Sequence, residues 1–183
     1  GFFLFIRVLK VGEDRRFREV KERFSGFLVW WTISALWVFL TTVNALVMII
    51  NNVEYHDDLF FYFGLIIWII GFSFEVIADE QKRRFRLESS NKGQFISSGL
   101  WSVSRHPNYF GEILLWIGMA IIAYPTLQAW QNISLISPVF IYYLLTKISG
   151  VNLLERHADE KWGGNQSYEE YKRNTSVLIP FLK

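Results

Sequence analysis

The stretch from Phe27 to Ile50 reads FLVWWTISALWVFLTTVNALVMII, 24 consecutive residues without a charged side chain. An α-helix rises about 1.5 Å per residue, so this run is long enough to cross a hydrocarbon layer of about 30 Å. A second run, Leu59 to Ala78, has 20 residues and only Glu75 near its end. Two runs of this length predict that the chain crosses a membrane.

Two further segments complete the predicted set of crossings. Tyr109 to Tyr124 is shorter and carries Glu112, whereas Ile133 to Leu154 is long and carries only Lys147. Of the 183 residues, 51% are hydrophobic and 18% aromatic, which is too apolar for an ordinary soluble domain of this length. A soluble bundle would have to bury these segments on all sides, and the chain has too little else to cover them. We therefore predict an all-α membrane bundle with four transmembrane helices.

The basic residues are distributed unevenly along the chain. Seven Lys and Arg lie in residues 1–26, six in 79–106 and six from Lys147 onward. The linkers 51–58 and 125–132 contain none. The positive-inside rule then places the first segment, the middle loop and the tail in the cytoplasm. The membrane would be the endoplasmic reticulum in a eukaryote and the inner membrane in a bacterium.

Both ends of the chain carry further expectations. Residues 1–6, GFFLFI, read as the remnant of an apolar helix, so we expect upstream transmembrane helices before a single membrane-embedded domain over 1–183. In the tail, Ser167 and Glu170 match a capping box, which predicts a short amphipathic helix after the Gly163–Gly164 break. That helix would lie on the cytoplasmic side, either flat on the membrane or beside the polar clusters described next.

The sequence FEVIADEQKRRFR at the end of the second apolar run places acids and bases on one helix face. At about 100° per residue, a stripe of about 60° contains Glu75, Asp79, Lys82 and Arg86. Ion pairs between successive turns and snorkelling basic side chains would explain this pattern without any binding site. Glu75 favours a site, because a carboxylate within a membrane is costly unless it faces a bundle interior or a wet cavity.

A second polar cluster is GLWSVSRHPNYFGE, residues 99–112. Pro107 predicts the start of a helix, because proline lacks the N–H that the first helical turn leaves unpaired. The polar side chains around this start project broadly to one side: Arg105, Asn108, Tyr109 and Glu112. Arg105 and His106 beside a helix N-terminus form a natural phosphate or carboxylate site. Contact of these two residues with lipid headgroups is the alternative, but it does not explain Glu112 inside a span.

Several function classes are disfavoured by what the sequence lacks. It has no GxGxxG or GxxxxGK[ST] motif, so we expect no soluble nucleotide-binding domain. Cysteine is absent, and His56, His106 and His157 lack metal-ligand spacing, so we expect no metal site. The basic residues lie at predicted membrane boundaries, and nucleic acid is therefore not an expected partner.

Five stretches together resemble the DUF1295 branch of the steroid 5-alpha-reductase superfamily. They are GEDRRF at 12–17, FEVIADEQ at 74–81, GLWSVSRHPNYFGE at 99–112, SGVNLLE at 149–155 and YKRNTSVLIP at 171–180. They cover nearly the whole chain in the family's order. The resemblance implies a membrane reductase that binds NADPH from the cytoplasmic side. Such an enzyme reduces a carbon–carbon double bond conjugated to a carbonyl in a lipid-like substrate, a steroid or another enone.

The resemblance also implies which residues contact NADPH. The family's Asn-x-x-x-Glu falls on Asn108 and Glu112, and counting back without a gap places its acid and arginine on Asp79 and Arg86. In the tail, Arg156, Tyr168 and Tyr171 resemble the family's last cofactor-facing segment. Weaker candidates lie in the GEDRRF stretch, namely Asp14, Arg15 and Arg16. With the residues suggested by charge and position, the expected cofactor-binding set is Asp79, Lys82, Arg86, Arg105, His106, Asn108, Tyr109, Glu112, Arg156, Tyr168 and Tyr171.

Alternatives remain open at this point. An isoprenylcysteine-carboxyl-methyltransferase-like enzyme shares the RHPxYxG element and an acidic, Tyr-rich tail but uses S-adenosylmethionine, and a non-catalytic membrane scaffold or lipid-binding protein would use neither cofactor. FEVIADEQ and GEDRRF favour the reductase. The family's catalytic Glu and Tyr lie on helices before its cofactor loop, so no catalytic residue is assigned. The expected partners are a lipophilic small-molecule substrate and membrane lipid.

Overall fold

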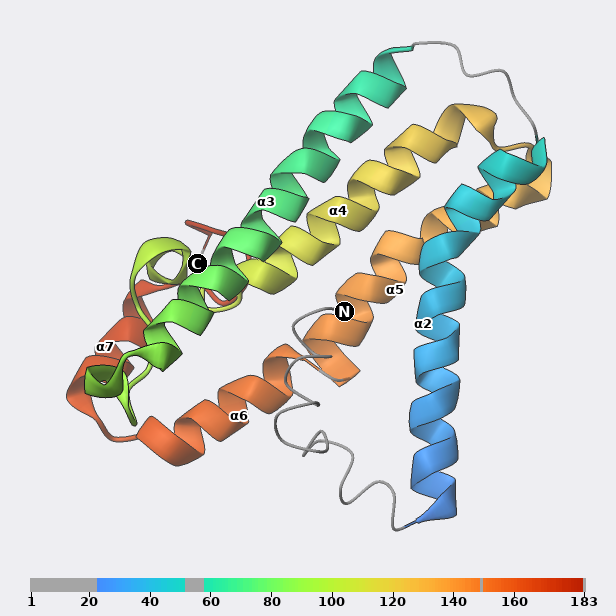
Figure 1. The fold of residues 1–183 in the computed structure, drawn as a ribbon. Helices are drawn as coiled ribbons and strands as arrows, with labels where there is room; N and C mark the ends of the chain where they lie inside the picture. The colour runs from blue at the N-terminus through green and yellow to red at the C-terminus, as the bar shows by residue number, and fades with distance from the viewer. Residues whose placement is uncertain (1–22, 52–57, 149, 183) are drawn as a thin grey trace. The chain divides into compact units, whose positions relative to one another are not determined.

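The computed structural model describes residues 23–51, 58–148 and 150–182, and in these residues the chain is almost entirely helical (Figure 1). The α-helices are α2 (Phe24–Asn51), α3 (Leu59–Leu87), α4 (Pro107–Ala123), α5 (Ser137–Tyr143), α6 (Val151–Trp162) and α7 (Gln166–Asn174). The 3₁₀ helices are η3 (Ser89–Asn91), η4 (Gly99–Ser102), η5 (Tyr124–Thr126) and η6 (Ala129–Ile136), and η7 (Leu144–Ile148) is a π-helix. The predicted N-terminal helix remnant and the weaker candidates Asp14, Arg15 and Arg16 lie outside the described residues.

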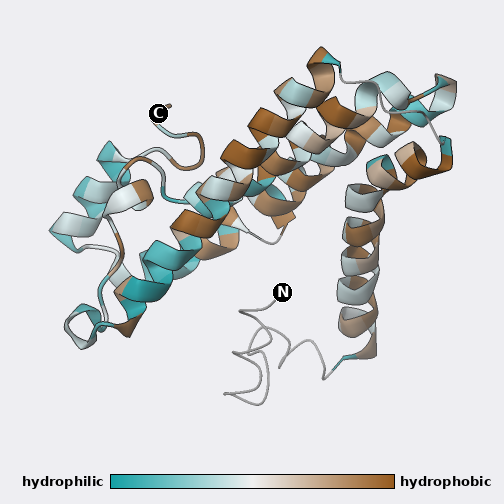
Figure 2. Ribbon diagram, turned by 45° about the horizontal axis from the view of Figure 1, so that its top comes forward, coloured by the Kyte–Doolittle hydropathy of each residue, from teal (hydrophilic) through white to brown (hydrophobic). Residues whose placement is uncertain are grey.

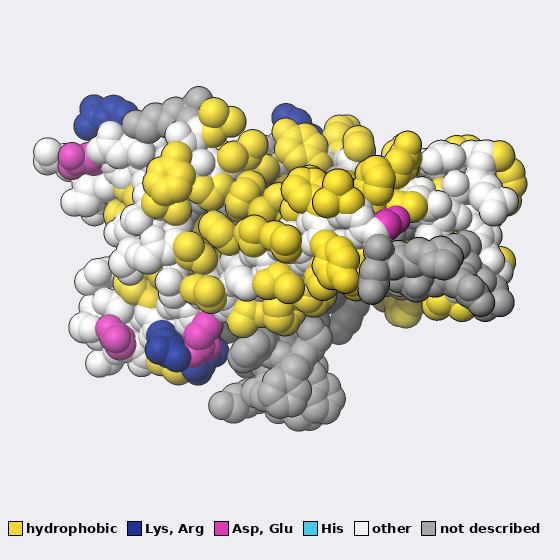
Figure 3. Space-filling view, turned by 90° about the horizontal axis from the view of Figure 1, so that it is seen from above, with side chains coloured by type: hydrophobic (Ala, Val, Ile, Leu, Met, Phe, Trp, Pro, Cys, Tyr) yellow, Lys and Arg dark blue, Asp and Glu magenta, His cyan; other side chains and the backbone are white. Residues whose placement is uncertain are grey.

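Four stretches of the described chain are long and apolar enough to cross a membrane, namely Phe24–Asn51, Leu59–Leu87, Pro107–Thr126 and Ala129–Trp162. Figure 2 shows the apolar residues of α3 along its first part and the hydrophilic ones towards its C-terminal end. In Figure 3, hydrophobic side chains cover the middle of the visible face, and most of the charged side chains in view lie towards one end. The predicted class, an all-α integral membrane protein with four spans, is confirmed.

The fourth span is less regular than the sequence predicted. The uninterrupted run Ile133 to Leu154 suggested one helix, whereas the structure passes from η6 through α5 and the π-helical η7 into α6. Pro138 lies in the first turn of α5, where its missing N–H favours a new helix start over continuation of the preceding one. Hydropathy alone does not register such changes of helix type, because it reports apolar length and not backbone geometry.

The chain divides into two compact units, residues 1–39 and 40–183. In the first unit, the described residues form the N-terminal part of α2. In the second unit, the rest of α2 makes polar contacts with the chain that follows α4. Asn44 Nδ2 donates a hydrogen bond to Ser137 Oγ at 2.8 Å, and Asn51 Nδ2 donates one to the carbonyl oxygen of Thr126 at 2.8 Å.

Helices α3 and α4 lie side by side and antiparallel, and glycines bring their backbones into contact (Figure 1). A Cβ atom added to Gly71 would lie 2.6 Å from the carbonyl oxygen of Gly111, and one added to Gly111 would lie 2.6 Å from that of Gly71. Gly64 and Gly118 form the same reciprocal contact further along the pair. The glycines are seven residues apart on both helices, so both pairs lie along one line of contact, which we call the glycine seam. Small residues allow helix backbones to approach this closely inside a membrane.

The C-terminal helix α7 begins two residues earlier than the sequence suggested. The predicted capping box of Ser167 and Glu170 is wrong, because the N-cap is Asn165. The Asn165 side chain accepts hydrogen bonds from the backbone N–H groups of Ser167 at 2.9 Å and Tyr168 at 3.3 Å. Asparagine is as good an N-cap as serine, so sequence pattern alone did not separate the two starts.

Candidate functional site

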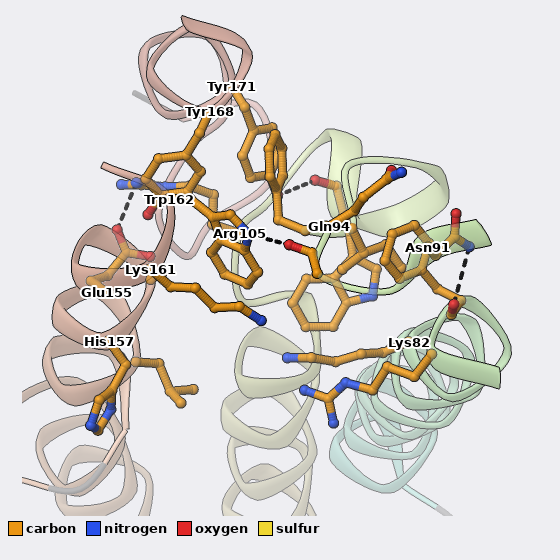
Figure 4. A pocket seen from close by; sticks show the side chains of 18 of the residues that line it. Lys82, Asn91, Gln94, Arg105, Glu155, His157, Lys161, Trp162, Tyr168 and Tyr171 are labelled. Carbon is orange, nitrogen blue, oxygen red and sulfur yellow. Dashed lines mark hydrogen bonds and ion pairs between the residues drawn. The ribbon is translucent and has the colours of Figure 1, made fainter. Parts of the chain in front are cut away.

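A cavity of about 480 Å³ lies at the polar end of α3, between that helix, the loop leading to α4, and helices α6 and α7 (Figure 4). Five lining side chains are cationic: Lys82, Arg86, Lys92, Arg105 and Lys161. Among the described lining residues, Glu155 is the one carboxylate. In Figure 4, Lys82 and Lys161 extend into the cavity from opposite sides. An anionic ligand would therefore meet an excess of positive charge from several elements of the fold.

Glu155 of α6 holds the start of α4 against the cavity. Its two carboxylate oxygens accept from Arg105 Nη1 at 2.6 Å and pair with His106 Nε2 at 2.8 Å. The His106 ring stacks on Tyr109, with ring centroids 5.7 Å apart and planes 8° apart. The Nε atom of Arg105 is buried without a hydrogen-bond partner. Because buried donors are normally paired, this N–H is a donor that a ligand or water could satisfy.

Trp101 forms a flat apolar wall of the cavity, and two hydrogen bonds attach its loop to α3. The Trp101 Nε1–H donates to the carbonyl oxygen of Ala78 at 3.0 Å, and the N–H of Leu100 donates to Gln81 Oε1 at 2.9 Å. The Lys82 ammonium group lies 4.2 Å from the centroid of the Trp101 ring. A cation on an aromatic face is stabilised by the ring quadrupole, so this contact holds a positive charge at the cavity wall.

A cluster of aromatic rings around Phe95 forms another wall of the cavity. Its ring lies 5.9 Å from Trp162, 5.3 Å from Tyr168 and 5.4 Å from Tyr171, measured between centroids. The Tyr171 hydroxyl donates to the carbonyl oxygen of Trp101 at 2.6 Å, which joins the two walls. Burial raises the pKa of both tyrosines above the usual value, and for Tyr168 the acceptor Asp159 raises the pKa further. Both hydroxyls therefore stay protonated at neutral pH.

A group of acidic and amide side chains continues from the cavity along the α3–α4 pair. The Asn108 side chain donates a hydrogen bond to Asp79, which also lies within electrostatic range of Lys82 and Arg86. On α4, Glu112 hydrogen-bonds to Trp116 and interacts with Asp79 and with Glu75. The stripe of charged residues on α3 thus faces α4, the helix that begins at Pro107.

The structure brings most of the predicted site residues together. Those that line the cavity are Lys82, Arg86, Arg105, His106, Tyr168 and Tyr171. Asp79, Asn108 and Glu112 form the adjoining polar group, and Tyr109 lies behind the His106 ring. Arg156 is not a lining residue, because its exposed side chain points to Glu160, with 3.9 Å between Nε and Oε1.

Several lining residues were not predicted from the sequence. They are mainly aromatic or lie on α6: Phe95, Trp101, Glu155, Lys161 and Trp162. Glu155 is adjacent in sequence to the predicted Arg156, and one helical residue is a rotation of about 100°, so the two side chains cannot share a face. One signal in the sequence could have identified Glu155, the last residue of SGVNLLE. An acid at the end of an apolar stretch suggests an ion pair with one of the predicted basic residues.

The fold and the cavity define a polytopic α-helical membrane protein with an anion-accepting pocket at the polar end of its spans. A sequence profile described as "Protein of unknown function (DUF1295)" matches residues 1–175. The chain therefore belongs to the DUF1295 family, and its relatives place it in the steroid 5-alpha-reductase superfamily.

Three curated relatives illustrate the similarity. The steroid 5-alpha-reductase DET2 of Arabidopsis thaliana is 27% identical over 136 residues, 70% of this chain and 46% of the relative. The 3-oxo-5-alpha-steroid 4-dehydrogenase 1 of Macaca fascicularis is 30% identical over 122 residues, 67% of this chain and 41% of the relative. The very-long-chain enoyl-CoA reductase of Dictyostelium discoideum is 30% identical over 121 residues, 66% of this chain and 36% of the relative.

The aligned parts span less than half the length of these relatives. No solved structure matches the chain significantly.

Proposed function

We propose that the chain forms the cofactor-binding part of a membrane-bound, NADPH-dependent reductase. Its substrate would be a lipid-like molecule, a steroid or another enone, with a carbon–carbon double bond conjugated to a carbonyl. The observation that supports this most is the cavity itself, where five cations and several aromatic rings adjoin the Asp79–Asn108–Glu112 group. The names of the relatives support the same chemistry, because they include reductases of steroids and of an enoyl thioester.

The charges of the cavity suit the phosphates of NADPH. The cofactor carries about four negative charges on its phosphates, and five lining cations face one carboxylate. Guanidinium groups such as Arg86 and Arg105 pair with phosphate oxygens through parallel N–H donors. Arg105 Nε supplies a buried donor without a partner.

The chain's own contribution would be binding, orientation and exclusion of water. When bound, NADPH would supply a hydride to the β-carbon of the enone, and the α-carbon would take a proton from a donor that is not assigned to any residue of this chain. Asn108 and Glu112 lie within a membrane span and offer an amide and a carboxyl group for the polar end of the dihydropyridine ring. Packed helices around such a ring keep it dry and aligned, which lowers the barrier without any further chemistry from these residues.

The proposal also includes the side of the membrane. The cavity contains residues 82–106 and 154–171, which belong to the two basic segments on either side of the last two spans. By the positive-inside rule both segments face the cytoplasm, where NADPH is available. The membrane would be the endoplasmic reticulum in a eukaryote or the inner membrane in a bacterium.

The first test replaces one arginine inside the cavity and one outside it. In the full-length protein in lipid nanodiscs, Arg86→Gln should weaken NADPH binding about tenfold, which is about 1.4 kcal/mol. Arg83→Gln is the matched control, because Arg83 lies on the same helix, pairs with Glu80 and does not line the cavity. Glu112→Gln should weaken binding while the variant keeps the wild-type melting temperature. Unchanged affinity in both Arg86→Gln and Glu112→Gln would contradict the assignment.

The second test compares cofactors. A ligand at 100 times its dissociation constant stabilises the folded protein by about 2.7 kcal/mol, which is readily seen as a higher melting temperature. NADPH should give this stabilisation and S-adenosylmethionine should not. Stabilisation by S-adenosylmethionine alone would identify a methyltransferase, and stabilisation by neither would indicate a non-catalytic membrane protein.

A further inference from the structure

Residues 177–182, which begin three positions after the end of α7, expose several apolar side chains. Their exposed side chains are Val177 at 41%, Ile179 at 45%, Phe181 at 85% and Leu182 at 64%. We refer to residues 177–182 as the C-terminal apolar segment. Exposed apolar side chains that are adjacent in the chain indicate a surface that another apolar phase covers.

Hydrogen bonds hold this segment against the loop that precedes α4. The N–H of Arg105 donates to the carbonyl oxygen of Ser176 at 2.9 Å, directly before the segment. Within the segment, the carbonyl oxygen of Leu178 accepts from Ser104 Oγ at 2.7 Å, and the N–H of Phe181 donates to the carbonyl oxygen of Val103 at 3.4 Å. The exposed side chains therefore sit on a backbone with a defined position.

Two contacts fix the depth of the segment relative to the membrane spans. The side chain of Leu178 packs on the core cluster of Ile113, Ile141 and Leu145. Ile113 lies six residues into α4, which is about 9 Å along the helix axis from its start. A side chain that reaches this cluster must come from a segment beside the apolar part of the bundle.

The loop before α4, to which the segment is hydrogen-bonded, is itself attached to α3 at a similar depth in the membrane. Trp101, two residues before Val103, donates its Nε1–H to the carbonyl oxygen of Ala78. The neighbours of Ala78 on α3 are Val76 and Ile77, both exposed and apolar, and they belong to the lipid-facing surface of that span. The C-terminal apolar segment thus continues the lipid-facing surface at the level where the apolar part of α3 ends.

We propose that the C-terminal apolar segment lies in the membrane interface, with Ile179, Phe181 and Leu182 among the lipid acyl chains. The partner of this surface is the phospholipid bilayer itself. The sequence left open whether α7 lies flat on the membrane or beside the polar clusters. The structure turns Tyr168 and Tyr171 of α7 into the cavity and exposes the apolar residues that follow.

This arrangement links the cavity to the bilayer. Tyr171 lines the cavity wall and is six residues before Val177 in the chain. Insertion of the segment would hold that wall at a constant height above the hydrocarbon layer. The position of the segment in the membrane interface does not depend on which ligand the cavity binds.

The test uses the absence of cysteine from the sequence. Phe181→Cys carries an environment-sensitive NBD fluorophore in phosphatidylcholine vesicles, and Leu182→Cys repeats the measurement should the first variant fail to fold. Arg173→Cys on the exposed side of α7 is the aqueous control, and Val76→Cys on α3 is the lipid control. Doxyl-labelled lipids should quench position 181 as strongly as position 76 and several-fold more than position 173, and iodide in the buffer should show the reverse order.

Two outcomes would overturn the proposal. Quenching of position 181 by iodide to the same extent as position 173 would place the segment in water. Protection of position 181 from both quenchers would mean that another part of the protein covers it.

Discussion

The glycine seam between α3 and α4 allows a stability prediction to be worked from distances. In Gly71→Ala, the new Cβ would lie 2.5 Å from the backbone nitrogen of Leu115 and 2.6 Å from the carbonyl oxygen of Gly111. Ordinary contact begins at 3.4 Å, so the shortest distance is about 0.9 Å too small. Both neighbours are backbone atoms of a helix and cannot rotate away, so the two helices must separate along the seam.

Overpacking of this kind typically costs about 1–3 kcal/mol, and loss of packing along the pair places Gly71→Ala at the upper end of that range. The measurement is reversible unfolding in bicelles by added dodecyl sulfate. Ile70→Val is the control, because Ile70 is exposed on the same helix and a lost methylene there leaves the seam intact. It should change the free energy of unfolding by less than about 0.5 kcal/mol.

A double-mutant cycle tests the geometry itself. Gly71 and Gly111 face each other reciprocally, so either alanine alone separates the helices by about the same distance. Once they are separated, the second alanine should cost less, and the double variant should lose less stability than the two single variants together. Simple additivity, or a cost for Gly71→Ala no larger than for Ile70→Val, would refute the close backbone contact.

Two further predictions concern the walls of the cavity. Glu155→Gln should lower the free energy of unfolding by about 2–3 kcal/mol, because it removes the carboxylate that pairs with Arg105 and His106. The control is Glu160→Gln, which changes an exposed acid on the same helix and should alter the free energy of unfolding by less than about 0.5 kcal/mol. Equal effects of the two substitutions would mean that Glu155 does not hold the start of α4 in place. Trp101→Phe should cost about 1–2 kcal/mol in the same unfolding assay, since it loses the indole hydrogen bond to Ala78, and an unchanged stability would show that this bond does not hold the loop.

The sequence predicted the parts of the fold that depend on local pattern. Long uncharged runs predicted the four spans, because length and hydropathy decide whether a helix can cross a membrane. Pro107 predicted the start of α4, since its conformational restriction acts locally. Helical periodicity placed Asp79 and Arg86 on one face, and the structure shows that this face meets Asn108.

The remaining parts of the candidate site depend on tertiary contacts. The loop around Phe95 has no periodicity, so nothing in the sequence indicates that its ring packs against Trp162 and two tyrosines of α7. Arg156 was expected at the site from resemblance, but the helical phase of α6 turns Glu155 inward instead. Residue spacing along the chain does not show how α6 is rotated about its axis, so it could not decide which of two adjacent residues faces the cavity.

Two glycine contacts one heptad apart also hold α3 and α4 together as one stiff pair of helices. Sliding of one helix along the other would move the glycines out of register and bring side chains of the same helix faces into the narrow seam, so this pair has no low-energy shear motion. The cavity has its other walls on α6 and α7. Any adjustment of the cavity to a bound ligand should therefore occur in α6 and α7, while α3 and α4 keep their position relative to each other.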